Sequence, residues 1–244
     1  MLDKAAKKRH YQPKPLSKPV SQYYFKTMLD RGSAQEIFIR LGQWLHAKNY
    51  LAAADGNFSL WKEEGLFWIT PSGVHKGFDS AMIPALVQSD GTVVEGSPST
   101  ETALHREVYL HCPRARAVIH AHPPSAIAWS IARPELRELP SDCFSEVILA
   151  LGSIPIVPYA RPGERELAES VRPFIQSHRA MILGRHGALS WGETVTEALN
   201  GIERMEHAAL ILAQAEALGG AKSLTHQETA WLKAKRTEMG YQTR

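Results

Sequence analysis

The sequence predicts a single α/β domain, and three observations support this fold class. The chain has 244 residues, of which 44% are hydrophobic, which is enough for one core without disulfide bridges. Short apolar runs typical of strands alternate along the chain with amphipathic patterns typical of helices. No apolar stretch approaches the roughly 20 residues that a membrane-spanning helix needs, so we expect no membrane span.

The helices and strands are expected from residue 33 onward, and neither repeats nor low-complexity tracts interrupt them. The long last helix is N-capped by Thr194 or Thr196 and stopped by two glycines. In order, the expected elements are a helix over 36–45, strands over 58–61 and 66–70, a helix from 99 to 110, a strand ending at His120, a helix over 125–132, a strand over 154–157, a helix over 164–177, a strand ending at His186 and a helix over 194–218.

The N-terminal end of the chain differs in composition from the rest. Residues 1–24 contain six basic side chains and one acidic side chain, a net charge of +5 in a chain whose total is +3, so the rest carries about −2. This segment also contains three prolines and few large apolar residues. We therefore expect a flexible basic extension over 1–24, the folded domain over 25–220 and a helical tail over 221–244. Because aromatic residues do not interleave the basic ones, we expect no nucleic-acid partner.

Cysteine usage bears on the compartment and on the type of metal site. The chain has two cysteines, Cys112 and Cys143, and they form no CxxC pair. We find no secretory segment in the sequence. These features favour a reducing, cytoplasmic compartment and argue against a disulfide scaffold and a cysteine-based zinc site.

The most informative motif is a pair of histidines, His120 and His122, at the end of a short apolar run. Because side chains alternate between the two faces of a strand, both imidazoles lie on the same face. Pro123 and Pro124 follow directly and end the strand there. Two neighbouring imidazoles suit a cation such as Zn²⁺, and a third would leave one coordination position open for chemistry.

His186 is the candidate for the third ligand, because it ends another short apolar run and is followed by a glycine. The plain alternative is a histidine without a metal role, since the chain has 11 histidines and most histidines in proteins bind no metal. Five of the others lie in helix-like or polar stretches and are expected at the surface or in packing: His105, His111, His178, His207 and His226.

Three loops before the histidine pair carry residue types that suit an anion and a polyol. They are GNFS at 56–59, TPSG at 70–73 and PSTE at 98–101. Glycine allows backbone N–H groups to approach a ligand oxygen, and the start of a helix favours a phosphate. The same residues also form ordinary turns, and Glu101 is an ordinary first-turn carboxylate of a helix.

Taken together, these segments resemble the class II aldolase/adducin family. The match covers nearly all of the chain from Ser33 to Gly219 and continues with HAHP at 120–123 and RHG at 185–187. The resemblance implies a three-layer α/β/α fold with a central mixed, largely antiparallel sheet. It also implies a homotetramer whose active sites lie at subunit interfaces.

The resemblance also assigns roles to individual residues. The metal ligands fall on His120, His122 and His186, which are the positions already singled out by spacing. Glu101 falls on the catalytic carboxylate of the family. The cofactor implied is Zn²⁺, although three imidazoles also bind other divalent transition metals. The phosphate-binding positions are matched by Asn57, Ser72, Gly73, Ser99 and Thr100.

One departure from the family pattern lies beside the phosphate positions. Ala54 stands where the aldolases have a threonine, and Asp55 follows it. The loss of a hydroxyl donor next to an added carboxylate weakens a phosphate site, so a substrate without phosphate is an alternative.

Two further residues are candidates for an acid or base. Glu146 lies in an otherwise apolar run, where related enzymes place a tyrosine or a glutamate, and its plain alternative is an exposed acid at a helix end. Tyr241, in the tail, is a candidate for closing the active site of a neighbouring subunit, as a tyrosine does in sugar-phosphate aldolases.

The expected function is that of a metal-dependent aldehyde-lyase in carbohydrate metabolism. It would cleave a short ketose 1-phosphate of the L-fuculose 1-phosphate type to dihydroxyacetone phosphate and a small aldehyde through a metal-stabilised enediolate. The alternative within the family is a methylthioribulose-1-phosphate dehydratase. A 4-epimerase fits less well, because epimerases typically have aspartate at the position of Glu101. A non-enzymatic adducin-like binding domain fits least, because such domains lack the three histidines.

Overall fold

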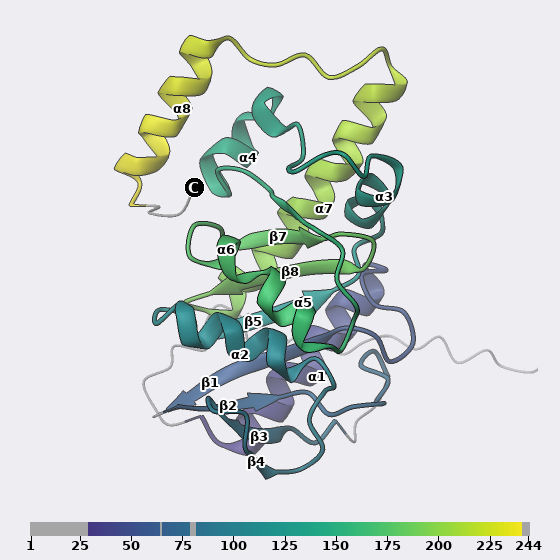
Figure 1. Cartoon of the computed structure of the whole chain (residues 1–244), viewed down its shortest axis with the longest axis vertical. Helices are drawn as coiled ribbons and strands as arrows, with labels where there is room; N and C mark the ends of the chain where they lie inside the picture. The colour runs from purple at the N-terminus through teal and green to yellow at the C-terminus, as the bar shows by residue number, and fades with distance from the viewer. Residues whose placement is uncertain (1–28, 64, 79–81, 241–244) are drawn as a thin grey trace, which may run out of the picture.

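A computed structural model describes residues 29–63, 65–78 and 82–240. The basic extension expected over 1–24 and the candidate Tyr241 lie outside these residues. The described chain is built around one continuous eight-stranded sheet (Figure 1). Its strands are β1 (Asn57–Glu63), β2 (Leu66–Ile69), β3 (Ala85–Gln88), β4 (Val93–Glu95), β5 (Ala117–Ala121), β6 (Ile156–Val157), β7 (Ala180–Leu183) and β8 (Gly187–Gly192).

The strand order is β4-β3-β2-β1-β5-β8-β7-β6. Six of the seven pairings are antiparallel, and only β6 with β7 is parallel. The sheet is therefore mixed and largely antiparallel, as expected. The central neighbours β5 and β8 pair over five residues, with His120 opposite Leu189 and Ala121 opposite Ala188. This pairing matters for function, because it joins the expected histidine pair to the segment that follows His186.

Helices cover both faces of the sheet (Figure 1). One face packs against α1, α3 and α7, and the other packs against α2, α5 and α6. None of the described helices is long and apolar enough to cross a membrane. The α-helices are α1 (Arg31–Ala47), α2 (Thr102–His111), α3 (Pro124–Ala132), α4 (Ser145–Ala150), α5 (Arg165–Ser170), α6 (Arg172–Ile175), α7 (Val195–Ala217) and α8 (His226–Glu238).

Side-chain alternation along β5 divides the core into two clusters. Ala117, Ile119 and Ala121 face α1, α3 and α7, whereas Val118 belongs to the cluster on the side of α2, α5 and α6. By the same period of two, His120 lies on the face of Val118, toward α2. All five residues of β5 are buried, so the imidazole of His120 is held inside the protein rather than at its surface.

The sequence-based elements differ from the structure in several places, including helix α4, which was not expected. Strands β3, β4 and β8 were not expected. The single helix expected over 164–177 is two short helices, α5 and α6, because Pro173 lacks a backbone N–H and starts a new helix instead of continuing one. His186 is not within a strand but in the three-residue turn that joins β7 to β8.

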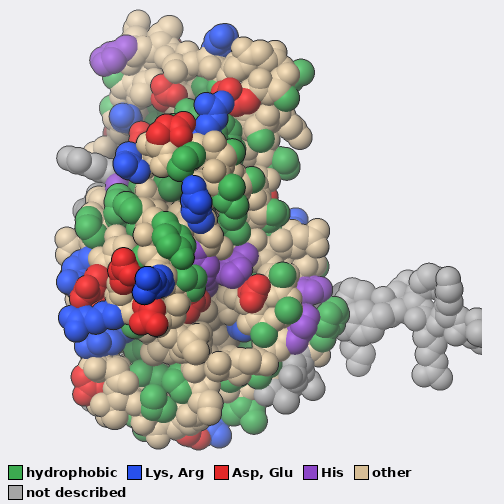
Figure 2. Space-filling model, turned by 45° about the vertical axis from the view of Figure 1, so that its right-hand side comes forward, with side chains coloured by type: hydrophobic (Ala, Val, Ile, Leu, Met, Phe, Trp, Pro, Cys, Tyr) green, Lys and Arg blue, Asp and Glu red, His purple; other side chains and the backbone are tan. Residues whose placement is uncertain are grey.

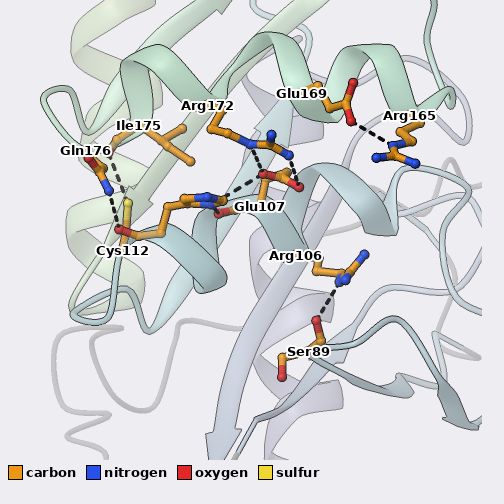
Figure 3. A network of polar contacts seen from close by, with 10 residues as sticks. Ser89, Arg106, Glu107, Cys112, Arg165, Glu169, Arg172, Ile175 and Gln176 are labelled. Carbon is orange, nitrogen blue, oxygen red and sulfur yellow. Dashed lines mark hydrogen bonds and ion pairs between the residues drawn. The ribbon is translucent and has the colours of Figure 1, made fainter.

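An ion pair with a buried carboxylate connects α2 and α6 on one face of the sheet (Figure 3). The carboxylate of Glu107 on α2 accepts two hydrogen bonds from the guanidinium of Arg172 on α6, at 2.9 and 3.0 Å. Its side chain is 10% exposed, whereas that of Arg172 is 47% exposed. His111 lies one turn further along α2, with Nδ1 3.4 Å from the same carboxylate. A second pair in this layer, Arg165 with Glu169, is exposed.

We predict that Glu107→Gln lowers the free energy of unfolding by about 1 kcal/mol, because a neutral amide pairs less well with Arg172 in a mostly buried position. For a chain of this size the melting temperature would fall by roughly 2–4 °C. The matched control is Glu169→Gln, which alters the exposed pair and should change the melting temperature less than half as much. Equal shifts of the melting temperature in the two variants would show that the Glu107 pair stabilises the fold no more than the exposed pair does.

Candidate active site

The histidine pair lies at the end of β5, as the sequence predicted. Nδ1 of His120 is 3.0 Å from the carbonyl oxygen of Ala188 on β8, and this contact is a hydrogen bond if Nδ1 carries the ring proton. That arrangement leaves the lone pair of Nε2 free for a ligand. Nε2 of His120 and Nε2 of His122 are 3.0 Å apart. Two ring nitrogens at this distance point toward one shared position.

His186 reaches the same position from the turn between β7 and β8. The turn is tight, and its middle residue, Arg185, has a positive φ of 59°. The backbone N–H of Arg185 donates to the hydroxyl of Ser130 on α3, which fixes the turn against the neighbouring helix. The ring of His186 lies 4.7 Å from that of His120 and 5.2 Å from that of His122, measured between ring centroids.

Glu101 brings a carboxylate to this cluster from the start of α2. It occupies the N-cap position of the helix, yet its side chain makes no capping hydrogen bond. Instead, Oε2 lies 3.2 Å from Nε2 of His120, and Oε1 lies 3.3 Å from Nε2 of His186. Asn57, the first residue of β1, donates from Nδ2 to Oε2 at 2.7 Å. The plain interpretation of Glu101 as a first-turn carboxylate therefore does not describe its contacts.

The donor set fits a divalent cation. The ligand atoms of His120, His122 and His186 all lie within 4.8 Å of one another. Within the described part of the chain, Oε1 of Glu101 is buried without a hydrogen-bond partner, so it adds an unsatisfied lone pair beside the imidazoles. A divalent cation satisfies these lone pairs, and three imidazoles leave a coordination position open for a substrate. Zn²⁺, Mn²⁺, Fe²⁺ and Co²⁺ all accept such ligands.

The electrostatic surroundings keep the three imidazoles neutral. Burial and the neighbouring imidazoles lower the pKa of His120 well below its usual value. Burial also lowers the pKa of His122 and of His186, although nearby carboxylates partly oppose the effect. Because only neutral imidazole binds a metal, these shifts favour metal binding at and below neutral pH.

A cavity of about 400 Å³ opens over the cluster. In the space-filling view, histidine side chains reach the surface near the middle of the molecule (Figure 2). Two of the loops singled out from the sequence are joined beside the cavity, because Ser99 N–H donates to the carbonyl of Thr70 and Ser72 N–H donates to that of Ser97. All five residues predicted to bind phosphate line this cavity: Asn57, Ser72, Gly73, Ser99 and Thr100.

Lys76 is a cavity residue that the sequence analysis did not identify. Its side chain is buried, and Nζ donates to the carbonyls of Ala54 at 2.5 Å and Val74 at 3.2 Å. Burial lowers its pKa to about 8, against the opposing effect of Asp55 and Glu101. An ammonium group has three N–H donors, so two hold the loops together and the third is available to a ligand. No motif marks this lysine, since its role depends on contacts with a loop 22 positions earlier.

The departure from the family pattern at Ala54 and Asp55 also falls within the cavity. Oδ2 of Asp55 lies 3.7 Å from Nδ1 of His122, and its side chain is 52% exposed. Asp55 therefore faces the ring nitrogen of His122 that points away from the cluster. In this position the carboxylate adds negative charge beside His122 and beside the expected phosphate positions.

The structure places one of the remaining two candidates. Glu146 lies exposed in the first turn of α4, which matches its plain interpretation, and it does not line the cavity. Tyr241 lies outside the described residues.

Comparison with known proteins identifies the family. The model of the class II aldolase and adducin N-terminal domain matches residues 36–213, a range that includes all three histidines and Glu101. The chain belongs to the class II aldolase and adducin family. Membership of this family accounts for the fold, and class II aldolases are metal-dependent. It does not identify the substrate.

Relatives in this family carry out different reactions. The chain is 30% identical over 186 residues to the 3-oxo-tetronate 4-phosphate decarboxylase of Escherichia coli K12, covering 74% of this chain and 86% of the relative. It is 33% identical over 172 residues to the L-fuculose phosphate aldolase of Methanococcus vannielii, covering 70% and 91%. Among solved structures, the L-fuculose-1-phosphate aldolase of Thermus thermophilus superimposes with a TM-score of 0.66 at 33% identity, covering 79% of this chain and all of that one.

We predict that Gly187→Ala weakens metal binding at least tenfold. A Cβ at this position would lie 2.7 Å from the carbonyl oxygen of Ala121 and from Cε1 of His120, and 2.8 Å from Cδ2 of His122, so the end of β5 and its two rings must shift. Competition with a coloured zinc chelator measures the affinity. The control is Gly32→Ala on α1, where the nearest atom would lie 3.6 Å away. A zinc affinity of Gly187→Ala within twofold of the wild-type value would contradict this close packing.

Proposed function

We propose that this protein is a metal-dependent lyase that forms dihydroxyacetone phosphate from a short phosphorylated substrate. The first candidate reaction is the cleavage of a ketose 1-phosphate of the L-fuculose type into dihydroxyacetone phosphate and a small aldehyde. The observation that carries the proposal is the position of Glu101, whose carboxylate lies 3.2 and 3.3 Å from two of the three clustered imidazoles inside the cavity.

The chemistry divides between the metal ion and the side chains of this chain. A divalent cation at the three imidazoles supplies positive charge to the oxygen of a substrate carbonyl, where negative charge develops as the carbon–carbon bond breaks. Glu101 is placed to give a proton to the carbon that becomes a carbanion and to take it back in the reverse direction. Asn57 holds one oxygen of Glu101 while the other faces the cluster.

The phosphate is expected between the loops at 70–73 and 98–100. Within the described part of the chain, the backbone N–H groups of Gly73 and Thr100 have no acceptor. Gly73 has a positive φ of 71°, a conformation that favours glycine and turns its N–H group out of the regular backbone direction. These donors, with the hydroxyl groups of Ser72 and Ser99, suit phosphate oxygens.

The two reactions named for the relatives share one intermediate. Cleavage between C3 and C4 of L-fuculose 1-phosphate leaves an electron pair on C3, next to the carbonyl at C2. Loss of carbon dioxide from a 3-oxo-tetronate 4-phosphate leaves an electron pair on C2, next to the carbonyl at C3. Both give the enediolate of dihydroxyacetone phosphate, and both need a proton at the same carbon. The site described above serves this common step whichever group departs.

Decarboxylation is therefore the second candidate function, and Lys76 is the observation that favours it. A 3-oxo-tetronate 4-phosphate carries a carboxylate besides its phosphate. The cavity contains the buried ammonium group of Lys76, which has one N–H donor beyond those used by the loops. A carboxylate of the substrate would pair with this charge, whereas the leaving aldehyde of an aldol cleavage carries none.

The proposal extends to the assembly and to two more residues. Zn²⁺ as the native metal, a cytoplasmic location and a homotetramer with active sites at subunit interfaces are carried over from the resemblance. In such an assembly, an exposed residue of one chain can border the cavity of another. We assign a second acid or base role to Glu146 or Tyr241 on this basis.

The test of the proposed function uses dihydroxyacetone phosphate alone, because this compound forms the common intermediate by losing one proton. We predict that zinc-loaded protein in deuterated buffer exchanges one hydrogen of the hydroxymethyl carbon stereospecifically, as followed by NMR. Glu101→Gln should retain its zinc and slow the exchange at least a hundredfold, because the amide cannot accept the proton. Metal content is measured on the same samples.

Each outcome of the exchange experiment has a defined meaning. Exchange that needs both metal and Glu101 supports the proposed intermediate and leaves the leaving group to be identified. Wild-type exchange in Glu101→Gln would remove Glu101 from the mechanism. Absence of exchange in zinc-loaded wild-type protein would reject the proposal and direct attention to a methylthioribulose-1-phosphate dehydratase or to a substrate without phosphate.

Lys76→Gln separates the two candidate reactions. We predict that it leaves the exchange of dihydroxyacetone phosphate within about threefold of wild type, because glutamine still donates a hydrogen bond to a neighbouring loop. If the substrate carries a carboxylate, the same variant should raise the KM for a 3-oxo-tetronate 4-phosphate at least tenfold, through loss of the ion pair. An unchanged KM would exclude Lys76 as the carboxylate partner.

A further inference from the structure

Behind Glu101 lies a continuous chain of buried hydrogen bonds that neither the motifs nor the comparisons describe. Nε2 of His105 is 2.5 Å from Oδ1 of Asn57, and Nδ1 of the same ring is 2.7 Å from the hydroxyl of Ser59. The hydroxyl of Tyr109 is 2.9 Å from that of Ser59. The side chain of Asn57 then contacts Glu101 at 2.7 Å. The chain therefore runs from Tyr109 through Ser59, His105 and Asn57 to Glu101.

Two neighbouring elements of the fold build this chain. Asn57 and Ser59 are two positions apart on β1, so their side chains lie on the same face of the sheet. Glu101, His105 and Tyr109 follow each other at intervals of four residues at the start of and along α2, so they share one side of the helix. His105 is fully buried, and Tyr109 is 6% exposed and packed against the rings of Trp61 and Phe67.

The direction of every hydrogen bond in this chain follows from the carboxylate of Glu101 at its end. A carboxylate only accepts, so Asn57 presents its NH₂ group to Glu101 and its oxygen to His105. The oxygen of Asn57 has no proton to give, so Nε2 of His105 must carry one. Burial lowers the pKa of His105 to about 3, so the ring is neutral and its Nδ1 accepts. Ser59 therefore donates to His105 and accepts from Tyr109.

We infer that His105 is a positioning residue for Glu101, acting in its Nε2–H tautomer. All donors in the chain point toward the carboxylate, so each bond polarises the next in the same direction. If Asn57 turned its amide over, its oxygen would face the carboxylate and its NH₂ group would face the proton on His105. His105 thereby fixes the amide of Asn57, and Asn57 fixes Oε2 of Glu101 beside His120.

The first test reads the tautomer directly and does not depend on any activity. Protein labelled with ¹⁵N in its histidine side chains is examined at neutral pH, metal-free and zinc-loaded, by long-range ¹H–¹⁵N correlation, and the His105 signal is assigned by its loss in His105→Gln. We expect a neutral ring protonated at Nε2 in both forms. A ring protonated at Nδ1, or at both nitrogens, would overturn the inference, and the measurement uses wild-type protein, so it holds even if variants fold poorly.

The second test separates positioning from simple packing, and its exchange readout rests on the proposed function. His105→Gln keeps a donor near the position of Nε2, whereas His105→Leu fills similar space without one. With zinc content equal to wild type, the leucine variant should exchange the hydrogen of dihydroxyacetone phosphate at least tenfold more slowly, and the glutamine variant should recover most of that loss.

The two tests tell a failure of the positioning role of His105 apart from a failure of the proposed function. Equal exchange rates in wild-type protein and the zinc-loaded leucine variant would overturn the positioning role. If wild-type protein shows no exchange at all, the proposed function fails, while the tautomer measurement still decides the inference about His105.

Discussion

The convergence of three imidazoles and one carboxylate at a single cavity is the constraint on which the candidate active site depends. Nε2 of His120 lies 3.0 Å from Nε2 of His122 and 3.2 Å from a carboxylate oxygen of Glu101. Polar atoms at these distances need either a proton or a cation between them. Rigid elements hold these groups together, since the end of β5 presents two imidazoles, the turn after β7 presents the third and the start of α2 presents the carboxylate.

Much of the site could be predicted from the sequence because its determinants are local. The alternation of side chains along β5 places His120 and His122 on one face, and the proline pair that follows ends the strand at the site. His186 was a candidate for the third ligand because it ends another short apolar run, and the resemblance added the loops that line the cavity. The layers and the mixed sheet followed from the same resemblance, and the strand pairing confirms them.

The missing parts depend on contacts between distant segments. Lys76 has no motif, and its place in the cavity arises from its hydrogen bond to Ala54 on another loop. His105 was grouped with surface or packing histidines, although its spacing of four residues from Glu101 was visible in the helix. Apolar and polar residues do not alternate strongly along β3, β4 and β8. These strands are therefore recognised by their pairing with neighbouring strands and not by their own residues. The motifs do not separate decarboxylation from aldol cleavage, because the two reactions differ only in the leaving group.

The two halves of the metal site are far apart along the chain. His120 and His186 are separated by 66 positions (186 − 120), and this interval contains α3, α4, α5, α6 and the strands β6 and β7. A cation held by both residues closes this long segment into a loop and binds only the folded chain. At a free metal concentration a hundred times the dissociation constant, such binding adds about 2.7 kcal/mol to the stability. A metal ion bound at the candidate site would thus also be a removable cross-link, which would couple the persistence of this part of the fold to the supply of metal.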